Sequence, residues 1–425
     1  MSKKETILLH LPAYRDPELI PTIKDAIARA KYPNRLRFGI CRQYCETDGF
    51  DNLEEFKDDD RVKVLDFNYK DAKGLPWARA QINENLLTDE DYILQLDSHH
   101  RFAKDWDETL IEMHNGLEAK GYKPVLGAYL PLYTPFNDPM GRTMEPWQQT
   151  FAAFYPHGTI FIRPGLLHGW ETMTEPPMSR FLSGHFCFAR SEWAREIKHD
   201  PDIYFSGEEL NLTVRSYTHG YDLFHPHKLV VWHSTMREER SGMLKWDDDS
   251  KLGVDWFNKQ EYARKKIRVL LRTEEDPNID LTGYDLGTVR TLRDFEKYAG
   301  FHFKRKAVQK YTLDNNYPPN PYIENDEIWE QSFSESFYHL VKLYRHDFPN
   351  SDYEFIHMAF DDENGLPIHV RTLSKEFLQE ALYNSPNGYF DFEEMFLTSK
   401  KPSRMVLWAY SNTRSWCERI EIKID

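Results

Sequence analysis

Two side chains that could bind a metal ion follow a short apolar segment, Tyr92–Leu96. The tripeptide Asp97-Ser98-His99 comes directly after it. A run of this length between polar flanks is typical of a buried strand, so the Asp97 carboxylate and the His99 imidazole would lie at the edge of a sheet. A divalent cation such as Mn²⁺ accepts a mixed set of oxygen and nitrogen ligands. The alternative is a surface turn in which Asp97 caps the next helix.

Hydrogen-bonding or metal-ligating residues also follow three other predicted strands. Residues 7–11 lead into Pro12-Ala13-Tyr14-Arg15-Asp16, residues 37–41 lead into Arg42-Gln43, and residues 229–233 end on His233. In open α/β sheets, ligands bind at the carboxyl ends of the strands, so four such ends could form one binding site. Polar residues also collect in loops generally, and for any one of these ends that is the simpler explanation.

Further charged or basic side chains occur outside the strand ends. Gly207-Glu208-Glu209 starts a predicted helix. The two carboxylates could simply be stabilised there by the helix dipole, or one of them could face an acceptor. Because adjacent helical residues diverge by about 100°, we expect only one of the two to face a site. Arg79 offers a guanidinium for a phosphate, or it is an ordinary surface arginine. His225 and His227 could bind metal, although the proline between them would splay the two rings at a turn.

Alternating strand and helix signals position these residues. Strands are predicted at residues 7–11, 37–41, 62–65 and 92–96, and helices at 17–31, 77–87 and 208–218. Further strand signals occur at 124–130, 158–162, 184–189 and 229–233, and further helices at 262–271 and 291–299. Such alternation predicts an α/β fold with a mostly parallel sheet and helices on both faces.

The composition changes after a turn-rich linker at residues 315–321. Predicted hairpins at 353–360 with 368–373, and at 404–410 with 417–424, flank one helical piece at 375–382. We therefore expect a domain over residues 1–314 and a small β-sandwich-like domain over 325–425. Trp408, Tyr410 and Trp416 could stack on sugar rings, but at hairpin spacing such aromatics more often belong to the core.

Composition excludes several classes of partner. The chain has 425 residues, which suggests two or three domains, and its net charge of −15 argues against nucleic acid or an anionic membrane surface as main partner. The four cysteines lack zinc-type pairing, so buried or free thiols are favoured over a disulfide framework. No segment approaches the ~20 apolar residues of a membrane span, and the apolar run at 6–11 is too short for a signal peptide. We expect a cytoplasmic protein.

Taken in order, these segments resemble known glycosyltransferases. Asp97-Ser98-His99, Gly207-Glu208 and Trp232-His233 resemble motifs of the polypeptide N-acetylgalactosaminyltransferases, although Glu209 stands where that family has asparagine. The chain is more similar to the cytoplasmic N-acetylglucosaminyltransferases that modify hydroxyproline and to their bacterial relatives. The segments that carry this likeness are 12–19, 39–43, 77–80, 96–102, 207–209 and 218–222, and they are spread over most of residues 6–300.

The resemblance implies a GT-A fold that transfers N-acetylglucosamine from UDP-GlcNAc, with retention of configuration, to a hydroxyl group of a protein or glycan. Asp97, His99 and His233 would hold Mn²⁺ or Mg²⁺. Glu208, facing the transferred sugar, and Arg79, near the diphosphate, would be the catalytic residues. The donor would be bound by Pro12, Ala13, Tyr14, Arg15, Asp16, Arg42, Gln43, Asp97, Ser98, Gly184, His185, Trp232 and Arg237. The resemblance implies no enzymatic nucleophile.

A non-catalytic glycan-binding protein is the alternative function. In that case the β-rich C-terminal domain would bind the glycan, and the first domain would be a degenerate scaffold. Binding alone needs neither a metal triplet nor phosphate-side arginines, which favours the enzyme. The C-terminal domain could serve acceptor recognition, oligomerisation or plain stabilisation, so a homo-oligomer is compatible with the sequence.

Overall fold

The computed structural model describes residues 5–235 and 243–424. The chain forms two compact units, of which the first comprises Met1–Lys304 and Tyr311–Tyr322 and the second comprises Arg305–Lys310 and Ile323–Asp425. Residues 305–310, which we expected in the first domain, therefore belong to the second unit. Among the described residues, no helix has both the length and the apolar character that a bilayer span requires.

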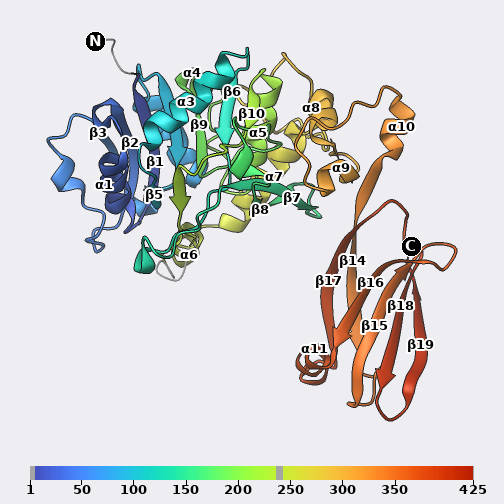
Figure 1. Ribbon diagram of the computed structural model, residues 1–425. Coiled ribbons are helices and arrows are strands. Elements are labelled where there is room, and N and C mark those ends of the chain that lie inside the picture. Colours follow the sequence, from blue (N-terminus) through green and yellow to red (C-terminus); the bar gives the residue numbers. More distant parts are fainter. Residues whose placement is uncertain (1–4, 236–242, 425) are drawn as a thin grey trace. The chain divides into compact units, whose positions relative to one another are not determined.

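A seven-stranded sheet forms the centre of the first unit, in the order β10-β6-β9-β4-β1-β2-β3 (Figure 1). Its strands are β1 (Ile7–Tyr14), β2 (Leu36–Tyr44), β3 (Val62–Asn68), β4 (Tyr92–Leu96), β6 (Pro124–Gly127), β9 (Phe186–Arg190) and β10 (Asp222–Phe224). Only β9 runs antiparallel to its neighbours, β4 and β6. The sheet confirms the predicted α/β fold with mostly parallel strands.

Helices cover both faces of this sheet and thereby bury its central strands on both sides. Tyr92 and Leu94 of β4 pack with α1 and α3, whereas Ile93, which points the other way, packs with α4 and α5. Cys41 of β2 packs with α2. The helices are α1 (Leu19–Arg29), α2 (Leu75–Asn85), α3 (Trp106–Glu118), α4 (Ser191–Glu196) and α5 (Glu208–Thr218).

Two small sheets complete the first unit. β5 (His100–Phe102) pairs antiparallel with β11 (Val231–His233), and β7 (Trp147–Phe154) pairs with β8 (Ile160–Leu166). The strand predicted at residues 229–233 is present as β11, but it pairs with β5 and not with the central sheet. The remaining elements are α6 (Lys245–Lys251), α7 (Trp256–Leu270), α8 (Leu292–Ala299), β12 (Phe301–His302) and α9 (Lys310–Leu313).

The second unit consists of two antiparallel sheets that share one core. In one sheet, β14 (Phe333–Tyr344) pairs with β13 (Ala307–Gln309) and β17 (Tyr389–Thr398). The other has the order β16 (Pro367–Ser374), β15 (Tyr353–Asp361), β18 (Arg404–Ser411), β19 (Ser415–Lys423). The core takes Val341 and Leu343 from the first sheet and Ile356 and Leu407 from the second. The helical segments are α10 (Asp326–Gln331), α11 (Lys375–Phe377) and a π-helical turn, Leu378–Tyr383.

Candidate active site

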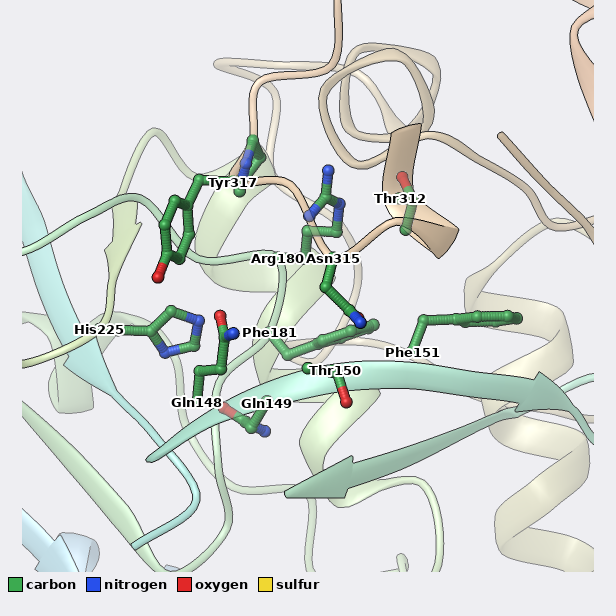
Figure 2. A pocket seen from close by; sticks show the side chains of 11 residues that line it. Gln148, Gln149, Thr150, Phe151, Arg180, Phe181, His225, Thr312, Asn315 and Tyr317 are labelled. Atoms are coloured by element: carbon green, nitrogen blue, oxygen red, sulfur yellow. The ribbon is translucent and has the colours of Figure 1, made fainter. Parts of the chain in front are cut away.

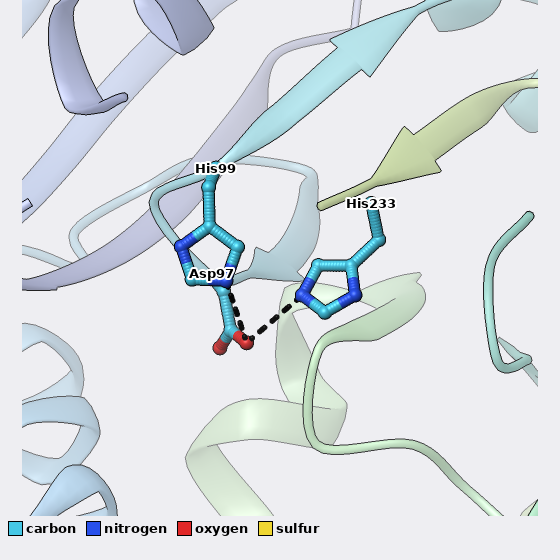
Figure 3. A group of neighbouring side chains, drawn as sticks. All are labelled: Asp97, His99 and His233. Atoms are coloured by element: carbon cyan, nitrogen blue, oxygen red, sulfur yellow. Dashed lines mark ion pairs between the residues drawn. The ribbon is translucent and has the colours of Figure 1, made fainter. Parts of the chain in front are cut away.

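Asp97, His99 and His233 converge at the carboxyl end of β4. The pairing of β5 with β11 places His233 opposite His100 and therefore beside His99. Asp97 Oδ2 lies 3.8 Å from His99 Nε2 and 3.5 Å from His233 Nε2 (Figure 3). One ligand atom from each residue lies within 4.8 Å of the others. The Asp97 side chain is 20% exposed, so the group is open to solvent.

These three residues fit a divalent cation. His233 Nε2 is buried without a hydrogen-bond partner among the described residues, which is costly unless something binds there. Burial acts to raise the pKa of Asp97, but His233, Arg79 and His99 outweigh it and hold this pKa well below its usual range. An ionised carboxylate with two imidazole nitrogens suits Mn²⁺.

Asp16 fixes the orientation of His99. Its buried carboxylate lies 2.7 Å from His99 Nδ1 through Oδ2, the same oxygen that accepts a 2.6 Å hydrogen bond from Ser98 Oγ. With the proton on Nδ1, the lone pair of His99 Nε2 is left toward Asp97. Metal-ligating histidines are commonly oriented by a carboxylate in this way. Asp16 and Ser98 were predicted among the donor-binding residues. In the structure Asp16 contacts His99 at Nδ1, and Ser98 contacts Asp16.

Two further histidines support His233. His100 Nε2 accepts a 3.1 Å hydrogen bond from the backbone N–H of Asp97, so its Nδ1 carries the proton and donates to Trp232 O at 3.0 Å. Burial and neighbouring imidazoles hold the pKa of His100 well below its usual range, which keeps the ring neutral. His185 stacks on His233 with ring centroids 4.3 Å apart. Of these two, His185 was predicted as a site residue and His100 was not.

Arg79 joins Asp97 to the start of helix α5. Its guanidinium is fully buried and lies 2.8 Å from Asp97 Oδ1 and 2.9 Å from Glu208 Oε1. It also donates to the backbone oxygen of Leu96 at 3.1 Å. Arg79 is therefore no surface arginine: it binds Asp97 through Oδ1, whereas His99 and His233 face Oδ2.

Glu208 and Glu209 both contact the segment around Gly184. A Cβ on Gly184 would lie 3.2 Å from Glu208 Oε2, and the Gly184 N–H donates to Glu209 Oε1 at 2.9 Å. Both carboxylates therefore lie beside Gly184, and the expectation that only one of the two faces a site stays a prediction. Burial raises the pKa of Glu208 to about 7, against the opposing effect of Arg79. The Tyr129 hydroxyl donates to Glu209 Oε2 at 2.6 Å.

The predicted donor-binding residues of β1 and β2 lie at adjacent strand ends. Ala13 pairs with Arg42 and Tyr14 with Gln43, while Pro12 is buried within β1. Gln43 Nε2 donates to Ala13 O at 3.4 Å. The Arg42 guanidinium binds Asp66 Oδ1 at 2.6 Å. These strand ends border the metal-ligand group because β1 lies next to β4 in the sheet.

Helix α6 contacts the end of β1. The Tyr14 hydroxyl donates to Asp248 Oδ2 at 2.9 Å, and Arg15 Nη1 lies 2.8 Å from the same oxygen. Arg15 also binds Asp48 at 2.6 Å, and its backbone has a φ of 46°, in the left-handed region. The sequence contains no signal for Asp248, which is 234 residues from Tyr14 along the chain.

The remaining predicted residues lie apart from the metal-ligand group. Trp232 points away from His233 and donates from Nε1 to Thr143 O at 2.7 Å. Arg237 lies outside the described residues. His225 bonds through Nδ1 to Gly127 O at 3.0 Å, and among the described residues only Asp97, His99 and His233 meet as potential metal ligands.

A small polar pocket lies elsewhere in the first unit, between β7 and residues 312–318 (Figure 2). Arg180 at its wall donates to Ala299 O at 2.9 Å and to Asn320 Oδ1 at 2.5 Å. It therefore ties the end of α8 to the following segment. No predicted site residue other than His225 lines this pocket.

Comparison with solved structures shows the type of fold. A crystal structure of GalNAc-T7 with UDP, GalNAc and Mn²⁺ has a TM-score of 0.51 at 13% sequence identity, covering 100% of this chain and 73% of that one. This likeness shows a fold of the GT-A type. A structure of S. aureus TarS with UDP is similar at a TM-score of 0.36 and 13% identity, over 62% of this chain and 69% of that one.

The family follows from the sequence. The family model described as "Glycosyltransferase (GlcNAc)" matches residues 6–60 and 49–305, which is more than half of the chain. The chain therefore belongs to this glycosyltransferase family. No curated protein matches the sequence.

Proposed function

We propose that the protein transfers N-acetylglucosamine from UDP-GlcNAc to a hydroxyl group of a protein or glycan, with retention of configuration. The observation that carries this proposal is the meeting of Asp97, His99 and His233, in which the buried His233 Nε2 faces Asp97 Oδ2 at 3.5 Å and has no hydrogen-bond partner among the described residues. Membership of the glycosyltransferase family supports the reaction class. The UDP and Mn²⁺ named for the GalNAc-T7 structure agree with a nucleotide donor and a divalent cation.

In this proposal Asp97, His99 and His233 hold Mn²⁺ or Mg²⁺. The cation, when bound, supplies positive charge to the diphosphate as UDP departs. Asp16 and Ser98 keep His99 in position, and Arg79 keeps Asp97 ionised. Because Arg79 is buried and engaged by two carboxylates, it acts on the leaving group through Asp97.

The donor lies across the ends of β1, β2 and β4 in this proposal. Pro12, Ala13, Tyr14, Arg15, Arg42 and Gln43 shape the nucleoside side, and the ends of these strands provide polar groups for uracil and ribose. Gly184, His185 and Glu208 face the transferred sugar. Gly184 suits this place because the absence of a Cβ leaves room beside the Glu208 carboxylate. Trp232 contributes indirectly, by holding β11 in place through Thr143.

The acceptor hydroxyl needs a base to take its proton. In a front-face retaining reaction the bond between the anomeric carbon and the UDP oxygen breaks, and the acceptor oxygen bonds to the same face. The proton of the acceptor passes to the departing phosphate oxygen, so no enzymatic nucleophile is needed. Glu208 binds and orients the sugar beside the reacting carbon, where its raised pKa keeps it sensitive to pH near neutrality.

We also place the reaction in the cytoplasm. All four cysteines are free thiols, and Cys41 and Cys187 are buried. Chains without disulfides are typical of reducing compartments. A homo-oligomer stays a prediction.

Release of UDP from a panel of UDP-sugars, with Mn²⁺ or with EDTA, tests the proposed function. We expect UDP-GlcNAc to be turned over fastest and EDTA to abolish turnover. Asp97→Ala and His99→Ala should remove activity without unfolding the protein, whereas His168→Ala, at an exposed histidine far from the strand ends in sequence, should behave like wild type. Faster turnover of another sugar would overturn the donor assignment. Undiminished turnover in EDTA would overturn the metal assignment.

A further inference from the structure

Four aromatic rings lie together on the outer face of the sheet β16-β15-β18-β19. We call Phe355, Trp408, Tyr410 and Trp416 the aromatic platform. Side chains alternate between the faces of a strand, and the neighbouring residues Ile356, Leu407 and Ala409 fill the core between the two sheets. The expectation that Trp408, Tyr410 and Trp416 belong to the core is therefore wrong. The register places Phe355 opposite Tyr410, and Tyr410 opposite Trp416.

The rings of the platform hold one another in place. Phe355 and Tyr410 stack with centroids 5.3 Å apart and an interplanar angle of 9°. Trp416 packs edge-on against both, at 5.6 Å and 5.4 Å, and lies 4.3 Å from Trp408. The Trp408 indole is fixed further by a 2.9 Å hydrogen bond from its Nε1 to Cys417 O. Trp416 remains 43% exposed, so the platform offers a preformed aromatic surface to solvent.

Hydrogen-bonding groups surround the platform, and their charges are compensated. His357 lies opposite Trp408 on β15, and the Arg419 guanidinium lies 5.9 Å from the centre of a Trp408 ring. Arg419 is paired with Glu421 at 3.3 Å. At the neighbouring turn, Arg414 is paired with Asp352 at 2.8 Å. Both of these arginines near the platform therefore have a carboxylate partner.

We propose that the aromatic platform is a binding site for an uncharged saccharide chain. The negative face of an aromatic ring attracts weakly positive C–H groups, which line one side of many pyranose rings. The flanking His357 and Arg419 can hydrogen-bond to sugar hydroxyls. Because the nearby arginines are already paired with carboxylates, the surface lacks the unbalanced positive charge that nucleic acid or an anionic membrane requires.

The size of the platform also favours a saccharide over a second copy of the chain. Stable protein interfaces use roughly 20–30 residues on each side, whereas the platform consists of four rings with a few polar neighbours. One or two stacked sugar rings match an area of this size. The proposal does not rest on the transferase reaction, because the platform and its surroundings lie entirely within the second unit.

Titration of the full chain with neutral oligosaccharides tests this proposal. The probes are a tetramer of N-acetylglucosamine and maltotetraose. Their binding is measured by isothermal calorimetry and by saturation-transfer NMR, with EDTA present and UDP absent. We expect wild type to bind at least one probe and Trp416→Ala to weaken that binding by about tenfold or more, as for aromatic stacking on nucleobases. Tyr338→Ala is the matched control, since Tyr338 is 39% exposed on β14, in the other sheet.

Thermal unfolding of each variant shows whether the fold is kept, and Trp416→Leu provides a second variant that retains apolar contacts. Failure of wild type to bind either probe would overturn the proposal. So would equal binding by wild type, Trp416→Ala and Trp416→Leu. If light scattering shows wild type to be a dimer that Trp416→Ala dissociates, and no saccharide binds, the platform is an interface between copies instead. UDP release is measured separately, so its outcome does not affect this test.

Discussion

At the scale of single residues, the site depends on side chains that hold the potential ligands. Asp16 lies 2.7 Å from His99 Nδ1, which directs Nε2 toward Asp97. We expect Asp16→Ala to weaken Mn²⁺ binding by about 10- to 100-fold, because loss of such an outer partner frees the ligand ring and its tautomer. Calorimetric titration with Mn²⁺ measures this directly. Ser98→Ala, which removes only the neighbouring hydrogen bond, should weaken binding less. Unchanged Mn²⁺ affinity in Asp16→Ala would contradict this role.

Arg79 is the residue on which two buried carboxylates depend. Arg79→Met should lower the free energy of unfolding by about 3 kcal/mol, because the charges of Asp97 and Glu208 then remain buried without a guanidinium. Glu208→Gln added to this variant should recover part of the loss. A double-mutant cycle measures this coupling, by urea denaturation at about pH 8 of wild type, both single variants and the double variant. Strictly additive effects would show that Arg79 and Glu208 do not interact.

The sequence supplied the ligand residues more readily than their supports. Asp97 and His99 were predictable because a strand ends immediately before them. The role of Asp16 was not, since a carboxylate at the end of β1 can turn toward a nucleotide or toward β5, and residue type does not distinguish these. In the sequence, nothing distinguishes the role of His100 from that of its neighbour His99. Only the register of β5 with β11 shows that His100 lies opposite His233.

At the scale of elements, regular periodicity was predictive and long-range pairing was not. Helix α5, Glu208–Thr218, has the predicted bounds. The strand at 229–233 was expected, but its partner was not, because β5 has only three residues and lies about 130 positions earlier. Strands β14 and β17 were missed because several of their apolar side chains, such as Leu340 and Met395, are exposed and interrupt the alternation.

The start of helix α5 depends on Gly207. Its φ is +98°, and a Cβ there would lie 2.5 Å from Ile267 Cγ1. Gly207→Ala should therefore cost about 2–3 kcal/mol of stability and reduce turnover by displacing Glu208. Gly253→Ala is the matched control: its φ is +71°, but nothing lies within 4 Å of the added Cβ. Strain alone should cost about 1 kcal/mol there. Equal costs in thermal denaturation would show that the contact with Ile267 is unimportant.

At the scale of the whole molecule, buried neutral histidines make the fold sensitive to acid. Burial lowers the pKa of His10 to about 3 and the pKa values of His114 and His225 to about 4, from 6.5. As pH falls, these histidines take up a proton in the unfolded chain before they do so in the folded chain. Their contribution to the free energy of unfolding is therefore complete above pH 6.5 and is lost as pH falls toward 4. Each histidine should lower the free energy of unfolding by roughly 1.4 kcal/mol per pH unit in this range.

Chemical denaturation at several pH values, with EDTA to remove metal, measures this loss. We expect the free energy of unfolding to fall steadily below pH 6.5. His114→Gln should reduce the slope, since glutamine can still donate to the Pro124 carbonyl that His114 contacts but does not take up a proton. Stability that is constant or rises toward pH 5 would contradict the account of these histidines.

The division into two units was predictable in outline, because the turn-rich segment after residue 314 separates helical from hairpin patterns. The sequence could not show that residues 305–310 belong to the second unit, since β13 is short and pairs with β14 across the linker. Nor could it show which face of the neighbouring strands β15 and β18 is buried, because aromatic residues occur on both faces.

The central claim is that Asp97, His99 and His233 hold a divalent cation that serves a nucleotide donor. Anomalous diffraction at the manganese absorption edge, from a crystal containing UDP and Mn²⁺, tests it most directly. We expect a single strong peak bounded by the Asp97 carboxylate and the two imidazole rings, beside the diphosphate. UDP bound at the ends of β1 and β4, with no anomalous peak among these three side chains, would contradict it.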